Sequence, residues 1–357
     1  MTKNNDTENE QEVPVLDETT SEPAPHKQFS ITSYGADYPV EALVSRMNKG
    51  DFHLPDFQRA YVWNLPQASR FIESLLLGLP IPSIFLFREE SNKHLVIDGQ
   101  QRLKTLQYFR NGTFKEKTFR LVEVSEPWND KCYTDLPDDD RRRFDDALLH
   151  AIIFRQEFPE QDRSSIYEVF ERLNSGGIKL SPQEIRICVS DGPFVKLIRT
   201  LNNNPDWRAI FGKQHIRGKD EELILRFLSL KFANNKYERP MKQFLDKFLS
   251  THRNLPSDSE EKFSAAFEQS IAIARKAFGT KAFRPEKILN AAVFDSVMLG
   301  LSAALEAKPD RDLGKIRAAY EALLQNRDYV AAYSVSTADE NQLKNRTVLA
   351  TRAFSEC

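Results

Sequence analysis

Apolar and polar positions divide the chain into three stretches of different character. Residues 1–27 hold almost no large apolar side chains, so this acidic tail is predicted to be disordered. Residues 28–160 alternate short apolar runs with segments of helical spacing, which predicts a mixed α/β domain. Residues 161–357 show helical spacing with almost no strand pattern and no repeat period, which predicts an irregular all-helical domain. The whole pattern predicts an α+β fold.

The clearest element of the α/β part is a helix over residues 66–77. Asn64 is placed to cap this helix, Pro66 suits its first turn, and Gly78 ends it. The other elements predicted in this part are a helix over 39–47, strands over 83–88 and 94–97 joined into a hairpin by a turn at 90–93, strands over 118–124 and 151–155, and a loop with a solvated helix within 135–146.

The remaining pattern predicts a series of helices. Ser181 and Glu184 form a complete capping box, with Pro182 at the first helical position. The helices predicted are 164–174, 184–190, 193–202, 220–235, 241–250, 260–278, 286–306, 310–326 and 338–354.

Residues 94–109, HLVIDGQQRLKTLQYF, predict a strand, a sharp turn and a helix in succession. The turn is Asp98-Gly99, and Leu103, Leu106 and Phe109 share one face of the helix. A helix start leaves backbone N–H groups without intrahelical partners, and the helix dipole adds partial positive charge there. An anion, most commonly a phosphate, is the natural occupant of such a site.

Polar side chains at this helix start are the candidate catalytic residues: Asp98, Gln100, Gln101 and Arg102. Arginine offers a rigid fork for phosphate oxygens, and glutamine can orient an attacking water. Asp98 is also the candidate metal ligand, and Gly99 is a candidate contact to a bound nucleotide. The alternative is that Arg102 pairs with Asp98 and only holds the turn together.

Two further segments carry polar residues that folding alone does not require. In LPDFQRAYVW, Gln58 and Arg59 interrupt an aromatic and apolar stretch, although they could simply cover a strand edge. In RLNSGG the candidate residues are Asn174, Ser175, Gly176 and Gly177, whose backbone N–H groups suit an anion. The alternative for RLNSGG is a simple joint between two helices, with the glycines as a left-handed helix stop.

The formal net charge of −2 shows no overall bias towards nucleic acid. Any DNA-binding surface must therefore be local, and the best candidate is the KQHIRGK cluster with Lys213, His215, Arg217 and Lys219. A solvated loop is the alternative for this cluster. Three widely spaced cysteines, with no signal peptide and no apolar run of membrane-spanning length, favour a reduced cytoplasmic protein without membrane association.

Common catalytic motifs are missing from the sequence. We find no Walker-type loop, no GxGxxG, no HExxH and no Cys/His zinc pattern. Four segments nevertheless occur in an informative order: PDFQRAYVW, IDGQQRLKTL, FERLNSGGIKLSPQEIR and DEELILRFLSL. Together they resemble the N-terminal domain of GmrSD-type restriction enzymes, a bacterial and phage family with a ParB/sulfiredoxin-like fold. The resemblance covers roughly residues 35–355.

This resemblance implies a nucleotide-handling domain, in a system that attacks foreign or modified DNA. It implies that the DGQQR motif supports hydrolysis of a nucleoside triphosphate, with Mg²⁺ as the expected metal. Arg102 would neutralise phosphate charge, Gln100 or Gln101 would position water, and Gln58 and Arg59 would form the opposing wall. The 28–160 part would then be the ParB-like domain.

Many relatives carry a second, His-containing nuclease domain, whose motif does not occur here. We therefore expect a DNA-recognition subunit that hydrolyses nucleotide and acts with a separately encoded nuclease. Two alternatives stay open: a DNA-binding module without catalysis, and a ParB-like nuclease that acts alone.

Overall fold

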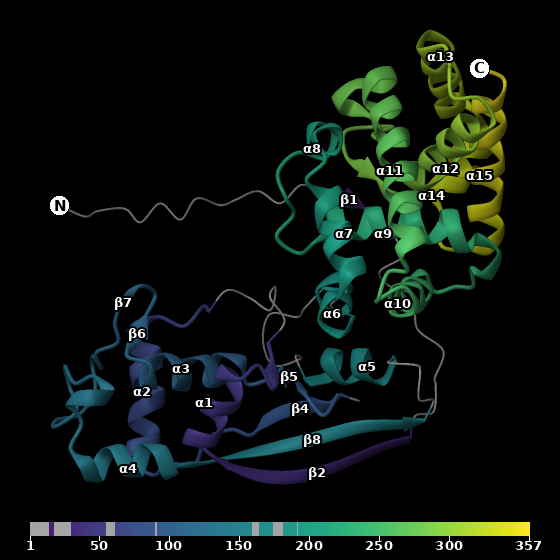
Figure 1. Cartoon of the computed structure of the whole chain (residues 1–357). Helices are drawn as coiled ribbons and strands as arrows, with labels where there is room; N and C mark the ends of the chain where they lie inside the picture. The colour runs from purple at the N-terminus through teal and green to yellow at the C-terminus, as the bar shows by residue number, and fades with distance from the viewer. Residues whose placement is uncertain are drawn as a thin grey trace, which may run out of the picture. The chain divides into compact units, whose positions relative to one another are not determined.

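The structure is a computed structural model that describes residues 14–17, 30–54, 61–89, 91–158, 164–173, 181–190 and 192–357. Its contacts divide the chain into two compact units (Figure 1). One unit is Lys27–Leu180 and mixes strands with helices, and the other combines Met1–His26 with Ser181–Cys357 and is helical. The predicted α+β class, with an α/β part followed by a helical part, is confirmed.

A five-stranded mixed sheet forms the base of the α/β unit, in the order β2-β8-β4-β5-β3. β8 pairs antiparallel with β2 and parallel with β4, while β5 pairs antiparallel with β4 and parallel with β3. The strands are β2 Ser30–Pro39, β3 Phe52–His53, β4 Ile84–Arg88, β5 His94–Asp98 and β8 Leu148–Phe158, with β6 Thr113–Phe114 and β7 Lys117–Thr118 forming a separate hairpin.

Alternate residues of the sheet pack against the first helices of this unit. Leu86 and Ile153 face the same core as Leu43, Leu75 and Leu106, because successive side chains of a strand point to opposite faces. The helices of this unit are α1 Val40–Asn48, α2 Leu65–Leu76, α3 Gln100–Arg110, the short 3₁₀ turn Tyr133–Asp135, α4 Asp138–Asp146 and α5 Ser164–Leu173.

Most predicted elements of this unit are present. Of the strand predicted over 118–124 only Thr118 is in a strand, β7, because the backbone beyond it bonds elsewhere: Leu121 N–H donates to Lys131 O and Val122 N–H to Ser69 Oγ. The ten-residue strand β2 was not predicted. It pairs with β8 at the sheet edge and leaves most of its side chains exposed, so its sequence lacks the apolar alternation of a half-buried strand.

The helical unit is organised around α12, whose side chains are almost all buried. The aromatic rings of Trp207, Phe267 and Phe294 meet beside it. The elements of this unit are β1 Val15–Leu16, α6 Pro182–Val189, α7 Pro193–Asn202, α8 Pro205–Phe211, α9 Lys219–Ala233, a 3₁₀ turn Asn234–Lys236, α10 Met241–Thr251, α11 Ser257–Phe278, a 3₁₀ turn Gly279–Lys281, β9 Leu289–Asn290, α12 Ala291–Ala307, α13 Leu313–Gln325, α14 Arg327–Ser334 and α15 Glu340–Ser355.

Two short helices, α8 and α14, were not predicted, because seven or eight residues hold too little periodicity to identify a helix. The acidic tail also contains an ordered stretch that its composition does not reveal. Val15 and Leu16 pair in parallel with Leu289 and Asn290 of β9, so residues 14–17 are an exception to the disorder expected for 1–27. No helix in the described part of the chain is long and apolar enough to cross a membrane.

Candidate functional site

The candidate site lies where β5 ends and α3 begins, at the turn that the sequence singles out. Gly99 connects the two elements with φ +101°, a left-handed conformation that favours glycine. A Cβ atom at this position would overlap the side chain of Ile84. Leu103, Leu106 and Phe109 are buried as predicted and fix α3 against the core. The chain direction and the glycine together hold the start of α3 at the C-terminal end of β5.

Asp98 and Arg102 form an ion pair across this turn. Arg102 Nη2 donates to Asp98 Oδ2 at 2.5 Å, and Arg102 Nη1 donates to the carbonyl of Pro82 at 3.2 Å. The arginine side chain is only 13% exposed, whereas the aspartate is 43% exposed. In the ligand-free structure Arg102 therefore holds the turn together, as in the structural alternative, while the Asp98 carboxylate remains open to solvent.

Gln101 anchors the segment that follows the second candidate motif. Its Oε1 accepts hydrogen bonds from the backbone N–H groups of Val62 at 3.1 Å and Trp63 at 3.4 Å. Thr105 Oγ1 donates to the carbonyl of Gln101, and the hydroxyl of Tyr61 lies 2.7 Å from Thr105 Oγ1. Burial raises the pKa of Tyr61 to about 12, so this phenol stays protonated. Residues 61–63 are thus fixed against the first turns of α3.

The other predicted site residues are in part not described. Gln58 and Arg59 lie outside the described residues, as do Asn174, Ser175, Gly176 and Gly177. Gln100 is described and its side chain is buried. The capping box at the start of α6 is confirmed, because Ser181 Oγ accepts from Glu184 N and Glu184 Oε2 accepts from Ser181 N.

The start of α3 has the donor set that a phosphate requires. No side chain caps this helix, and its first intrahelical bond runs from Leu103 N–H to the carbonyl of Gly99. The helix dipole favours an anion beside the N–H groups of the first turn, although Gly99 and Gln100 are themselves buried. Asp98 is the carboxylate at this turn, and it is 43% exposed. Within the described residues there is no cluster of three or more His, Cys, Asp or Glu side chains that could hold a metal by itself.

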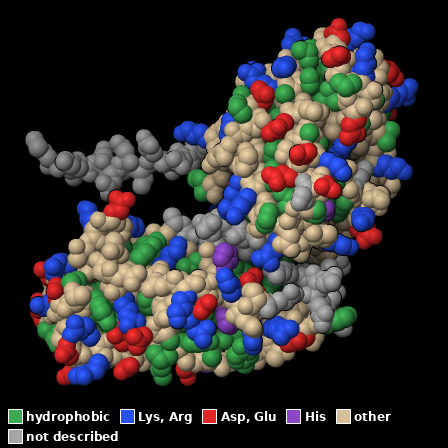
Figure 2. Space-filling model, viewed as in Figure 1, with side chains coloured by type: hydrophobic (Ala, Val, Ile, Leu, Met, Phe, Trp, Pro, Cys, Tyr) green, Lys and Arg blue, Asp and Glu red, His purple; other side chains and the backbone are tan. Residues whose placement is uncertain are grey.

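The structure places only three of the four residues of the predicted basic cluster at one cavity. His215, Arg217 and Lys219 line one cavity in the helical unit, together with Asp17 from the N-terminal segment. Lys213 is exposed and is not among the residues that line this cavity. Lys219 points inward, because its Nζ lies 2.5 Å from Asp17 Oδ2 and 2.6 Å from Glu222 Oε1. Lysine and arginine side chains alternate with acidic ones on the face shown in Figure 2.

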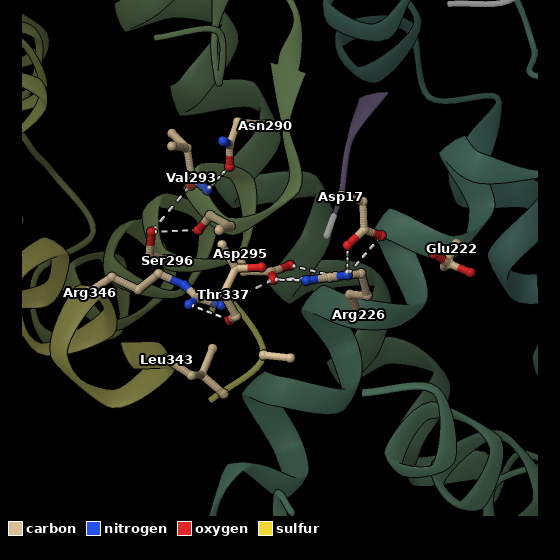
Figure 3. A network of polar contacts seen from close by, with 12 residues as sticks. Asp17, Glu222, Arg226, Asn290, Val293, Asp295, Ser296, Thr337, Leu343 and Arg346 are labelled. Carbon is tan, nitrogen blue, oxygen red and sulfur yellow. Dashed lines mark hydrogen bonds and ion pairs between the residues drawn. The ribbon is translucent and has the colours of Figure 1, made fainter. Parts of the chain in front are cut away.

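Sequence reasoning missed a buried network of charges in the helical unit (Figure 3). Arg226 contacts Asp17 through Nη1 at 3.1 Å and Asp295 through Nη2 at 2.6 Å. Arg346 lies beside Asp295 and donates to the carbonyl of Thr337 at 2.6 Å. Burial opposes the charged form of Arg226, but Asp295 and Asp17 raise its pKa overall. The signal was present in DEELILRFLSL, where Arg226 stands within the run Leu223–Leu228 that is otherwise apolar.

Comparison with known protein families matches residues 40–188 to the family described as GmrSD restriction endonuclease, N-terminal domain. The match covers α1 through α6, and therefore includes the β5–α3 corner, the 54–63 segment and the RLNSGG segment. A search of curated proteins found no match.

Proposed function

We propose that the chain is a component of a restriction-like defence system that acts on DNA, because residues 40–188 match the family described as GmrSD restriction endonuclease, N-terminal domain. The order of the four sequence segments supports this assignment along most of the chain. The observation that carries the biochemical part of the proposal is the uncapped start of α3, bordered by Asp98, Gln101 and Arg102.

In this proposal a nucleoside triphosphate binds with its phosphates at the N-terminus of α3. The backbone N–H groups of the first turn bind phosphate oxygens, and Arg102 turns from Asp98 to the phosphates. Asp98 is 43% exposed, so water screens its attraction for Arg102 and a phosphate group can compete with it for the guanidinium. Asp98 is then released to hold Mg²⁺, which when bound would neutralise charge on the phosphates.

The two glutamines have separate roles. Gln101 positions residues 61–63 through its Oε1. Gln58 and Arg59, which lie outside the described residues, are proposed to form the opposing wall. Gln100 is the remaining candidate for orienting the attacking water. Asn174–Gly177 are proposed to add a second set of backbone contacts to the nucleotide.

The test uses the full-length protein with ATP, GTP and CTP, each with Mg²⁺ and with or without duplex DNA. We expect the wild type to bind one of the nucleotides and hydrolyse it, and Arg102→Ala to lose at least tenfold in affinity. Arg110→Ala is the matched control, because Arg110 lies on the same helix and pairs with Glu41 at 2.8 Å, away from the turn. The control should bind nucleotide like the wild type.

Other outcomes of this experiment decide between the alternatives. DNA binding without nucleotide turnover, unchanged in Arg102→Ala, would leave only a DNA-binding module. Mg²⁺-dependent nicking by the purified chain, lost in Asp98→Asn, would identify a nuclease that acts alone. If Arg102→Ala unfolds the protein, Arg102 is a structural residue and the nucleotide site is refuted. We propose that cleavage otherwise comes from a separately encoded nuclease, and that Lys213, Arg217 and their neighbours contact DNA phosphates.

A further inference from the structure

The helical unit contains a cavity of about 510 Å³ whose lining includes no residue of the proposed nucleotide site. Asp17 borders this cavity from the N-terminal segment, Ser181 and Gln183 border it at the start of α6, and His215, Arg217 and Lys219 border it before and at the start of α9. A volume of this size is within the range of small-ligand sites. All of these residues belong to the same compact unit.

The carboxylate of Asp17 shows that Arg226 and Lys219 bind an oxyanion here. Both oxygens of its carboxylate lie 3.1 Å from Arg226 Nη1, and one of them lies 2.5 Å from Lys219 Nζ. Its side chain is only 3% exposed. Figure 3 shows the carboxylate pointing at the Arg226 guanidinium, with Asp295 on the other side. An oxyanion held between an arginine and a lysine is the arrangement in which proteins bind phosphate.

Charge balance among the described residues favours an anion at this position. Among the described residues, the ion pairs connect four cations, Arg186, Lys219, Arg226 and Arg346, with four carboxylates, Asp17, Glu222, Asp246 and Asp295. Without Asp17 this connected set carries one excess positive charge in a buried environment, which is strongly unfavourable. Another anion must then replace it.

The second observation is a hydrogen-bond donor that lacks an acceptor. Gln183 lines the cavity and is 1% exposed, and its Oε1 accepts a hydrogen bond from Arg186 Nη1 at 3.2 Å. Its Nε2 has no partner within the described structure. A buried donor without a partner costs about 1–3 kcal/mol, so an acceptor supplied by a ligand would remove this penalty.

We propose that this cavity binds a phosphate group, and that Asp17 occupies part of the site as a built-in competitor. The phosphate replaces the Asp17 carboxylate at Arg226 and Lys219 and accepts a hydrogen bond from Gln183 Nε2. Within the described residues the strand pairing of this segment is short, Val15 and Leu16 with Leu289 and Asn290, so little ladder structure opposes displacement of Asp17. The phosphate belongs either to a nucleotide or to a nucleic-acid backbone. The inference is independent of the nucleotide site at α3.

The experiment measures binding of inorganic phosphate to the full-length protein by calorimetry, at constant ionic strength. Asp17→Asn removes the competing charge and should bind phosphate at least tenfold more tightly than the wild type. Gln183→Glu in the Asp17→Asn background keeps the acceptor for Arg186 but replaces the donor with a negative charge, so this affinity should be lost. Gln214→Glu is the matched control. Gln214 is exposed in the loop that carries His215 and Arg217, and it does not line the cavity.

Folding and competition complete the test. If Asp17→Asn folds only in phosphate buffer, the exchange of one anion for the other is supported directly. If it stays unfolded with phosphate, or binds phosphate no better than the wild type, or if Gln183→Glu has no effect, the proposal is overturned. Competition by AMP would assign the site to a nucleotide, and competition by duplex DNA alone would assign it to a nucleic-acid backbone.

Discussion

Arg102 both stabilises the observed turn and is the proposed ligand of the phosphate. A guanidinium that already contacts Asp98 and the carbonyl of Pro82 is held within one turn of the position where phosphate would bind. Because Asp98 is partly exposed, its attraction for Arg102 is screened by water, and a more highly charged phosphate is the stronger partner. The ion pair keeps the arginine ordered, which would reduce the entropy lost if phosphate binds as proposed.

Gly99→Ala tests the geometry of this corner. The new methyl group would overlap Ile84, and φ of +101° is strained for alanine, so we expect a loss of about 2–4 kcal/mol in the free energy of unfolding. Urea denaturation of the full-length protein measures this loss. Gly112→Ala is the control, because its φ is +75° but no atom lies within 4 Å of the added Cβ. Equal losses in both variants would show that the contact with Ile84 is unimportant.

His94, in the strand that leads to the corner, should make folding sensitive to acid. Burial, followed by Arg46 and Arg88, lowers its pKa, and its Nδ1 has no hydrogen-bond partner within the described structure. The unfolded chain, with a histidine pKa near 6.5, then binds the proton more readily than the folded one. The free energy of unfolding should therefore fall as pH drops below about 6.5. The fall is about 1.4 kcal/mol for each tenfold by which the folded state binds the proton more weakly than the unfolded state.

The comparison for His94 is His94→Leu, which removes the titrating group. Denaturation midpoints measured between pH 7.5 and 5 should decrease less steeply in the variant than in the wild type. Parallel curves would contradict the assignment of this acid sensitivity to His94.

At the scale of elements, the sequence was most informative where several local signals agree. The helix predicted over 66–77 is α2, Leu65–Leu76, with the predicted Asn64 cap. The hairpin predicted over 83–97 is β4 and β5. The turn at Asp98-Gly99 combines a strand, a glycine and a helical face, and all three are present.

Elements that depend on distant partners could not be predicted. The edge strand β2 is set by its pairing with β8, more than a hundred residues away, and not by its own apolar pattern. The pairing of Val15 and Leu16 with β9 likewise has no local signal. At the site, the sequence identified Gln101 as a polar residue near α3. That its Oε1 would accept from Val62 and Trp63 follows only from the tertiary fold.

Asn64→Ala tests how much the capping box contributes to α2. Asn64 Oδ1 accepts from Gln67 N–H at 2.9 Å, and Gln67 Oε1 accepts from Asn64 N–H at 3.0 Å. Loss of the cap should lower the free energy of unfolding by about 1 kcal/mol, measured by urea denaturation. Asn64→Asp keeps the acceptor and should remain within a few tenths of a kcal/mol of the wild type. A similar loss in both variants would show that the missing cap acceptor is not the cause of the lower free energy of unfolding.

At the scale of the molecule, each unit has its own core, and the helical unit also has a buried chain of charges. Buried ion pairs contribute little net stability compared with apolar packing, but removal of one member leaves an uncompensated charge. Here the charges connect the N-terminal segment, α9, α12 and α15, which are far apart in sequence. We infer that they specify which of these elements come together, including the return of the N-terminal segment to the helical unit.

The variant Asp295→Asn tests whether the buried charges organise the helical unit. The variant is nearly isosteric but leaves Arg226 without its Nη2 partner carboxylate and Arg346 without a nearby negative charge. We expect a loss of about 3–5 kcal/mol. Since the units have separate cores, calorimetry should show the loss in the transition of the helical unit and leave the other transition in place. Glu356→Gln, which breaks an exposed pair with Arg352, should change neither transition. A loss below 1 kcal/mol in Asp295→Asn, or an equal shift of both transitions, would show that the network does not organise the helical unit.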